Sequence, residues 1–146
     1  MEDYRKAREK ALNYISYCNR TEAQVRTKLK ELEFESEIIE STINFLKEYD
    51  YINDEKFTTQ FVENGLKYKG KSRRKLQQEL YQKGIRTNIE VTEDIETAER
   101  ETISKLLNKF KYSSELDKKE QDKIFSKITR KGFSYTQIKL IIETME

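Results

Sequence analysis

The most strongly charged segment of the chain is KYKGKSRRKLQQELYQKGI, residues 67–85. Its first nine positions hold six cations and no acid precedes Glu79, whereas the whole chain has a net charge of only +2. Cations at this density bind phosphates or an acidic protein surface, although a solvated helix start gives the same pattern. The candidate contact residues are Lys67, Lys69, Lys71, Arg73, Arg74 and Lys75.

The residues that follow extend this candidate surface. A helix over 72–83 places Leu76 and Leu80 on its inner face, because residues four apart share a face. Arg74, Gln78 and Tyr81 then point outward together, so a cation, an amide and an aromatic ring share one exposed face. We therefore add Gln78 and Tyr81 to the candidate contact set.

A second basic run lies in the expected helix at 117–131. Its candidate contact residues are Lys127, Arg130 and Lys131. Three acids lie among its cations, and acids three or four residues from a cation on a helix form ion pairs. The sequence therefore favours an ordinary solvated face here, and we rank these cations below the first set.

The residue types argue against catalysis. The chain has no histidine and one cysteine, Cys18, which disfavours a zinc site with nitrogen and sulfur ligands and excludes imidazole acid–base chemistry. Gly65 and Gly70 lack the Gly-Lys-Ser/Thr sequence that ends a phosphate-binding loop. We expect a protein that is not an enzyme, with no catalytic residues, cofactor or metal.

Composition points to a cytoplasmic, all-α protein. With no proline and only four glycines in 146 residues, few positions interrupt helices. No apolar run reaches the roughly 18 residues that span a bilayer, and the charged start MEDYRKAREK does not resemble a signal peptide. Cys18 follows Tyr4, Ala7, Ala11 and Ile15 at helical spacing, so we expect it to be a small buried residue.

An internal repeat defines the organisation of the chain. The segments VRTKLKELEF (25–34), LQQELYQKGI (76–85) and IFSKITRKGF (124–133) each carry an aliphatic residue at positions one and five and Phe or Ile at position ten. This period of about 50 residues predicts stacked helical units. We expect three tandem three-helix repeats, at 1–52, 53–96 and 97–146, in an elongated, curved array.

Each repeat is expected to contain a first, a middle and a last helix. The first helices are predicted at 3–18, 54–69 and 97–112, the middle ones at 21–33, 72–83 and 117–131, and the last ones at 36–48, 87–95 and 134–145.

Capping residues support these boundaries. Thr21, Thr87 and Ser134 each precede a Gln or Glu by three residues, the form of a capping box, and Asp54 is placed to cap the helix after YIND. Gly84 and Gly132 lie where the middle helices end, as glycine tolerates the left-handed conformation there. The first repeat has Glu33 at this position, so we expect a different turn.

A DNA-binding helix-turn-helix protein is an alternative interpretation, because a helix, a turn with glycine and a second helix form such a unit. The last helices of the first two repeats, however, carry several acids each, and phosphates repel acidic helices. Sequence-specific reading of duplex DNA is therefore disfavoured. A single-stranded DNA-binding protein without sequence preference stays open, since tyrosines lie between the lysines.

The ordered motifs of the chain resemble the bacterial RecX family of regulatory proteins. YINDEKF (51–57) is similar to a family run with arginine at the place of Lys56, and KGKSRRKLQQELYQKGI (69–85) resembles its basic helix. ALNYISYCNRTEAQVRTKLKELEF (11–34) is similar to the opening unit and ITRKGFSYTQIKLII (128–142) to the closing unit. Glu33, where the other repeats have glycine, is a departure.

This resemblance implies a function and a fold. Members of the family bind the RecA recombinase and its filament on single-stranded DNA, and most inhibit ATP hydrolysis, strand exchange and the SOS co-protease activity. The family fold is three tandem three-helix repeats in a monomer that lies in the groove of the filament. The partners expected for this chain are RecA and the RecA–DNA filament, with weak direct DNA binding and no membrane.

Overall fold

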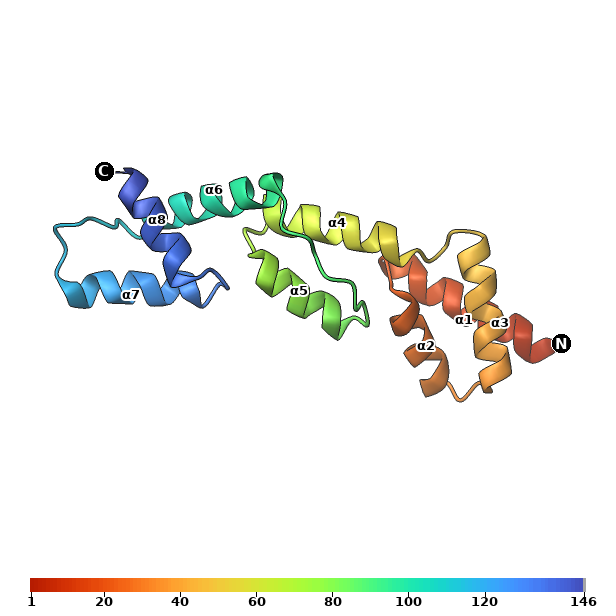
Figure 1. Cartoon of the computed structure of the whole chain (residues 1–146). Coiled ribbons are helices and arrows are strands. Elements are labelled where there is room, and N and C mark those ends of the chain that lie inside the picture. Colours follow the sequence, from red (N-terminus) through yellow and green to blue (C-terminus); the bar gives the residue numbers. More distant parts are fainter. Residues whose placement is uncertain (146) are drawn as a thin grey trace. The chain divides into compact units, whose positions relative to one another are not determined.

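The computed structural model describes residues 1–145, which form eight α-helices and no strand (Figure 1). The all-α repeat array predicted from the sequence is confirmed. The helices are α1 (Glu2–Tyr17), α2 (Glu22–Glu31), α3 (Ser36–Glu48), α4 (Asp54–Lys67), α5 (Arg73–Gln82), α6 (Glu93–Lys109), α7 (Lys118–Thr129) and α8 (Tyr135–Met145).

The chain divides into two compact units. The first contains residues Met1–Gln60 and Glu79–Thr87, and the second contains Phe61–Gln78 and Asn88–Glu146. The division falls within α4 and α5, so it does not follow the boundaries expected for three repeats. The division into repeats at 1–52, 53–96 and 97–146 stays an interpretation of the sequence.

The first unit is built around α1, α2 and α3, each of which packs against the other two. Small residues on α1 allow close approach, because Ala7 and Ala11 are fully buried. The remaining core side chains come from α2, α3 and the segment after α3, and are Val25, Leu29, Ile38, Ile39, Ile43, Leu46 and Ile52. One hydrophobic core therefore fixes these three helices.

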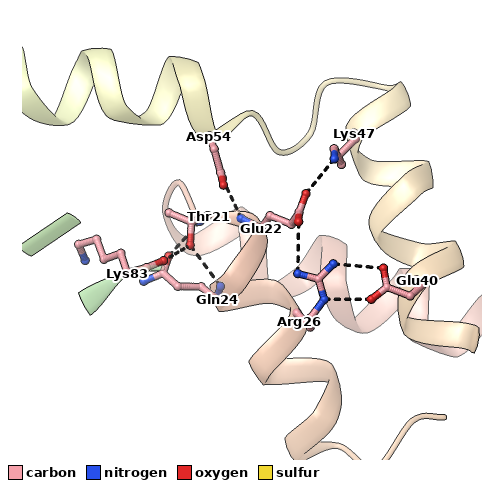
Figure 2. A network of polar contacts seen from close by, with 8 residues as sticks. All are labelled: Thr21, Glu22, Gln24, Arg26, Glu40, Lys47, Asp54 and Lys83. Carbon is pink, nitrogen blue, oxygen red and sulfur yellow. Dashed lines mark hydrogen bonds and ion pairs between the residues drawn. The ribbon is translucent and has the colours of Figure 1, made fainter. Parts of the chain in front are cut away.

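Polar contacts at the start of α2 join four segments of this unit (Figure 2). Thr21 is fully buried and forms the predicted capping box with Gln24, while its hydroxyl donates to the Lys83 carbonyl at 2.6 Å. The Glu22 amide donates to the Asp54 carboxylate at 2.9 Å. Asp54 thus caps α2 rather than α4, and Asn53 caps α4 by accepting from the Lys56 amide.

Ion pairs continue this network along α2 and α3. Arg26 contacts both Glu40 oxygens, at 3.0 and 3.1 Å, and also the Glu22 carboxylate at 3.2 Å, and Lys47 reaches Glu22 at 2.9 Å. Lys47, with Arg26, lowers the pKa of Glu22, while Arg26 lowers the pKa of Glu40. Glu40 in turn raises the pKa of Arg26. We refer to Glu22, Arg26, Glu40 and Lys47 as the α2–α3 charge network.

The second unit has its own core, to which α6, α7 and α8 contribute and in which each of these helices packs against the other two. Its buried side chains are Ile103, Leu107, Ile124, Ile128, Phe133, Ile138 and Ile141. Capping supports the helix starts, because Asp117 accepts from the Glu120 amide and Ser134 forms the predicted capping box with Gln137.

The turn after the middle helix has a residue in the left-handed conformation at the same position in all three repeated segments. Glu33, Gly84 and Gly132 have φ values of 66°, 87° and 102°. The expectation of a different turn at Glu33 is therefore wrong: the Phe34 amide donates to the Leu29 carbonyl as the Ile85 amide donates to Leu80. Glu33 adopts a conformation that L side chains rarely take.

The helix predicted at 87–95 is absent, and this prediction is wrong. Residues 85–92 are not helical, and the Thr87 capping box does not form; Thr92 instead caps α6 by accepting from the Ile95 amide. β-Branched residues alternate at Thr87, Ile89 and Val91, which disfavours helix. The helical stripe of α6, with Ile95, Ile103 and Leu107 buried, begins where the predicted helix was to end.

The prediction for Cys18 is also wrong, because this residue is exposed. Helix α1 ends at Tyr17, and the extended backbone of Cys18, with φ −168° and ψ 167°, takes its side chain off the helical stripe. Tyr4, at the other end of the stripe, is exposed as well, so only Ala7 and Ala11 of the stripe are fully buried.

Candidate partner-binding surface

The end of α4, the turn at 68–72 and the start of α5 position the first set of cations, and all of these residues belong to the second unit. The turn is compact because the Lys71 amide donates to the Gly65 carbonyl at 2.9 Å and the Tyr68 amide to Asn64 at 3.0 Å. Gly70 has φ 59°, in the left-handed region. Backbone contacts therefore hold the lysines of this turn in place.

Glycine at position 65 is required by packing. A Cβ atom there would lie 2.3 Å from the Leu76 side chain, which is fully buried. Helices α4 and α5 consequently approach closely at this point, and the close approach fixes the direction in which α5 leaves the turn.

The start of α5 is anchored by buried polar groups. Ser72 is 1% exposed and its hydroxyl accepts from the Lys75 amide at 3.0 Å. Glu99, on α6, accepts from the Arg73 amide at 3.2 Å and from the Gln137 side chain at 2.8 Å. A buried carboxylate at a helix N-terminus is favourable, because the free amides and the helix dipole are positive there.

The extended segment after α5 is held by α5 side chains. The Ile89 amide donates to the Gln77 side chain at 2.6 Å, and an Arg73 nitrogen lies 3.5 Å from the Ile89 carbonyl oxygen. These contacts replace the hydrogen bonds that a helix at 87–95 would have made. Arg73 is half-buried as a result, so its role in the structure is partly to support this segment.

The six predicted cations thus have different environments. Lys69 and Arg74 are exposed and have no ion-pair partner within the part of the chain that the structure describes. Lys67 pairs with Glu63 at 3.1 Å, which raises the pKa of the Lys67 ammonium group. Lys71, Arg73 and Lys75 are half-buried. We call the six cations Lys67, Lys69, Lys71, Arg73, Arg74 and Lys75 the α5 basic surface.

The predicted outer face of α5 is confirmed as exposed. Leu76 and Leu80 are fully buried, whereas Arg74, Gln78 and Tyr81 lie at the surface. Tyr81 belongs to the first unit, where the Arg86 guanidinium lies 3.9 Å from the centre of its ring.

In the structure, the turn that follows the second basic run lies against the start of α5, where the first run is located. A Cβ atom on Gly132, in the turn between α7 and α8, would lie 2.1 Å from the Ser72 hydroxyl oxygen and 3.4 Å from the Lys75 Cβ atom. Lys131 therefore precedes a turn that touches the start of α5. Lys127 lies over the Phe110 ring, 5.0 Å from its centre, and Lys127, Arg130 and Lys131 are all exposed.

The ion pairs expected along α7 do not form. Among residues 1–145, no carboxylate lies within 4 Å of Lys118, Lys119, Lys123, Lys127, Arg130 or Lys131. Asp117 caps the helix instead. The two basic runs of the second unit therefore form a larger cationic surface than the sequence indicated.

Sequence reasoning missed the supporting residues Glu99 and Arg86. Glu99 follows Ile95 by four residues and precedes Ile103 by four, so it is an acid on an apolar stripe. This pattern indicates a buried carboxylate with a partner, but it does not identify α5 as that partner. Within the described residues, no cluster of three potential metal ligands occurs, and no helix is long and apolar enough to cross a membrane.

Comparison with known proteins identifies the family. The models of the first and second three-helix domains of RecX match residues 7–46 and 53–89. A regulatory protein RecX from Clostridioides difficile is 31% identical over 99% of this chain and 70% of its own length. The chain belongs to the RecX family.

Further relatives agree with this membership. A crystal structure of RecX from Lactobacillus salivarius superimposes with a TM-score of 0.80 at 32% identity, and covers 98% of this chain and 96% of that chain. A regulatory protein RecX from Streptococcus agalactiae is 33% identical over 92% of this chain. This chain spans only 54% of the Streptococcus agalactiae protein. The RecX relatives are named as regulatory proteins, not as enzymes.

Proposed function

We propose that this protein binds the RecA recombinase and its filament on single-stranded DNA, and inhibits ATP hydrolysis, strand exchange and the SOS co-protease activity. Membership of the RecX family supports RecA as the partner. The observation that carries the proposal is the α5 basic surface, in which Lys69 and Arg74 are exposed without an ion-pair partner among the described residues. We further propose that the protein acts in the cytoplasm as a monomer.

A binding mechanism needs no catalytic residue. Docking along the groove of the filament would contact successive RecA protomers and restrict the motion between them. The anchored start of α5 suits this role, since Ser72 and Glu99 hold its backbone in position before binding. A surface that is already ordered loses less conformational entropy when it binds.

A single-stranded DNA-binding protein without sequence preference is the second candidate. Tyr68, between Lys67 and Lys69, is 81% exposed, and an exposed ring among cations can stack on a base. A tandem helix-turn-helix protein that reads duplex DNA is less well supported, because α3 carries exposed acids and the last helix predicted for the middle repeat is absent.

Fluorescence anisotropy of labelled single-stranded DNA distinguishes the first two candidates. The protein is titrated into naked DNA and into DNA coated with RecA and a slowly hydrolysed nucleotide, at two salt concentrations, with RecA ATPase followed in parallel. Tighter binding to the coated strand with falling ATPase is expected for a filament regulator. Equal or tighter binding to naked DNA, with a steep salt dependence, would instead identify a DNA-binding protein.

A further inference from the structure

An exposed aromatic cluster lies at the end of α3, in the first unit. Phe45, Tyr49 and Tyr51 form it, with ring centres 5.0 Å apart for Phe45 and Tyr49 and 6.2 Å apart for Phe45 and Tyr51. Tyr49 is 62% exposed and Tyr51 51% exposed. We call these three residues the α3 aromatic patch.

The two tyrosines of this patch do not belong to the core of the unit. The buried face of α3 consists of Ile38, Ile39, Thr42, Ile43 and Leu46, and the half-buried Phe45 packs against this core. Aromatic rings that remain half in water after folding are enriched at sites that bind partners. The exposed tyrosines are therefore suited to contact another molecule.

The chain itself shows which chemistry the patch accepts. The guanidinium carbon of Arg8 lies 4.2 Å from the centre of the Phe45 ring, a distance typical of a cation–π contact. Among the described residues, neither Tyr49 nor Tyr51 has a cation over its ring. Two further rings of the same cluster are thus available to a cation from another molecule.

Three carboxylates line a hollow that two of the rings also line. Arg8, Phe45 and Tyr49 line an open hollow of about 600 Å³ with Glu37, Glu40, Ser41, Asn44 and Glu48. Glu40 is paired with Arg26, whereas Glu37 and Glu48 are exposed and have no ion-pair partner in the described part of the chain. Glu48 therefore lines the same hollow as the exposed Tyr49 ring, and Arg8, the cation in its lining, lies over the Phe45 ring.

We infer that the α3 aromatic patch binds a cationic segment of a partner protein, with an arginine side chain stacked on Tyr49 and paired with Glu48. A guanidinium stacks on a ring and donates to a carboxylate at the same time, which a lysine ammonium does less well. Nucleic acid does not fit, since the exposed carboxylates repel phosphates. This inference concerns a surface separate from the α5 basic surface and does not depend on the proposed function.

The test uses an acetylated and amidated 12-residue peptide with four arginines spaced by glycine and alanine, titrated into the ¹⁵N-labelled full chain. A second peptide carries citrulline, a neutral isostere, in place of each arginine. We expect the arginine peptide to shift the amide signals of Asn44, Glu48, Tyr49 and Tyr51, and the citrulline peptide to leave them in place.

Variants make the test specific. The double variant Glu48→Gln with Tyr49→Ala should weaken binding of the arginine peptide about 3- to 10-fold, since a cation–π contact and an exposed ion pair are both lost. The matched control is Tyr17→Ala with Glu31→Gln, which also removes one exposed ring and one exposed acid from the same unit. The control should bind as the unchanged protein does.

Four outcomes would overturn the inference. Binding could shift amides scattered over the acidic surface, or the citrulline peptide could bind equally well. The double variant could keep full affinity while its amide spectrum shows that it is folded. Alternatively, the unchanged protein could dimerise through this patch at the concentrations used, which would make a second copy of the chain the occupant.

Discussion

In the first compact unit, Arg26 lies between Glu22 and Glu40, and Lys47 completes the α2–α3 charge network. In the second unit, Lys69, Arg74 and the cations of α7 have no carboxylate within 4 Å among the described residues, and the buried Glu99 contacts a backbone amide and Gln137. Both units are small helical packings. The α2–α3 charge network joins helices of the first unit, whereas Lys69, Arg74 and the α7 cations of the second unit have no ion pair among the described residues.

We expect the two units to respond differently to substitution. Changes in the α2–α3 charge network should alter stability and leave partner binding intact. Changes in the exposed cations of the second unit should do the reverse. The contacts that support the α5 basic surface should affect both properties.

The largest effect is expected for Gly132→Ala. Alanine is strained at φ 102°, and its Cβ atom would lie 2.1 Å from the Ser72 hydroxyl oxygen, so the cap of α5 must move. We expect a loss of about 2–4 kcal/mol in the free energy of unfolding, from backbone strain, steric overlap and a weakened cap. Urea unfolding of the variant and of the unchanged protein measures this difference in the free energy of unfolding.

Gly70→Ala is the control for Gly132→Ala. Its φ of 59° carries the backbone strain, but the nearest atom to the new Cβ, in the Thr102 side chain, is 3.3 Å away. A loss of about 1–2 kcal/mol is expected from strain alone. Equal losses for the two variants would mean that the contact between Gly132 and Ser72 contributes nothing.

An intermediate effect is expected for Arg26→Met, which breaks the charge network of the first unit but keeps the length of the side chain. Glu40 then loses its partner and Glu22 keeps only Lys47. We expect the midpoint of thermal unfolding to fall by about 2–4 °C, because a partly exposed pair contributes modestly. Lys30→Met, on the exposed face of α2, should change it by less than about 1 °C.

The same network gives stability a pH dependence. The pKa values of Glu22 and Glu40 are lowered in the folded protein by Lys47 and Arg26, so folding favours their charged forms. This contribution is fully present above the usual glutamate pKa, about 4.3, and is lost as the pH falls through the lower folded values. In urea titrations between pH 7 and pH 3, the unchanged protein should lose more stability than the double variant Glu22→Gln, Glu40→Gln. Parallel losses would contradict the role given to the network.

The smallest effect is expected for Glu33→Gly, and it should be stabilising. Glycine adopts φ 66° without strain, as Gly84 and Gly132 do at the equivalent turns, although it loses more entropy on folding. A gain of about 0.5–1 kcal/mol is expected in urea unfolding. Glu31→Gly, two residues earlier at the last residue of α2, should instead destabilise the protein, by less than the roughly 1 kcal/mol that glycine costs inside a helix.

Much of the fold could be predicted from the sequence because the signals are local. The stripes of Val25 and Leu29, Leu76 and Leu80, and Ile124 and Ile128 are buried as their spacing predicted. The capping boxes at Thr21 and Ser134 form, since each depends only on residues three apart. Local periodicity failed at 87–95, where β-branched alternation and the Thr92 cap outweigh the acidic helix-like composition.

The candidate surface could be predicted only in part. The density of cations at 67–75 is a property of the sequence, and the exposure of Arg74 and Gln78 follows from helical geometry. Which cations are engaged depends on distant residues: Arg73 is held by Glu99 and Ile89, and Gly132 places the turn after α7 beside Ser72. No local pattern specifies such contacts.

These contacts also determine the best variant for testing the proposed function. Reversing both Arg73 and Arg74 to glutamate would disturb the half-buried Arg73 and its contact with the Ile89 carbonyl. Lys69→Glu with Arg74→Glu avoids this problem, because both side chains are exposed. Arg74 lies in the first turn of α5, where an acid is favourable to the helix dipole.

Binding of the Lys69→Glu, Arg74→Glu variant to RecA-coated single-stranded DNA, followed by anisotropy at fixed salt, tests the α5 basic surface as the contact with the filament. The matched control is Lys6→Glu, Lys10→Glu, which changes the net charge equally at two exposed positions on α1. We expect binding at least about tenfold weaker for the first variant, with unchanged thermal unfolding, and near-normal binding for the control. Equal affinity of the two variants for the coated strand would contradict the assignment of the α5 basic surface as the contact.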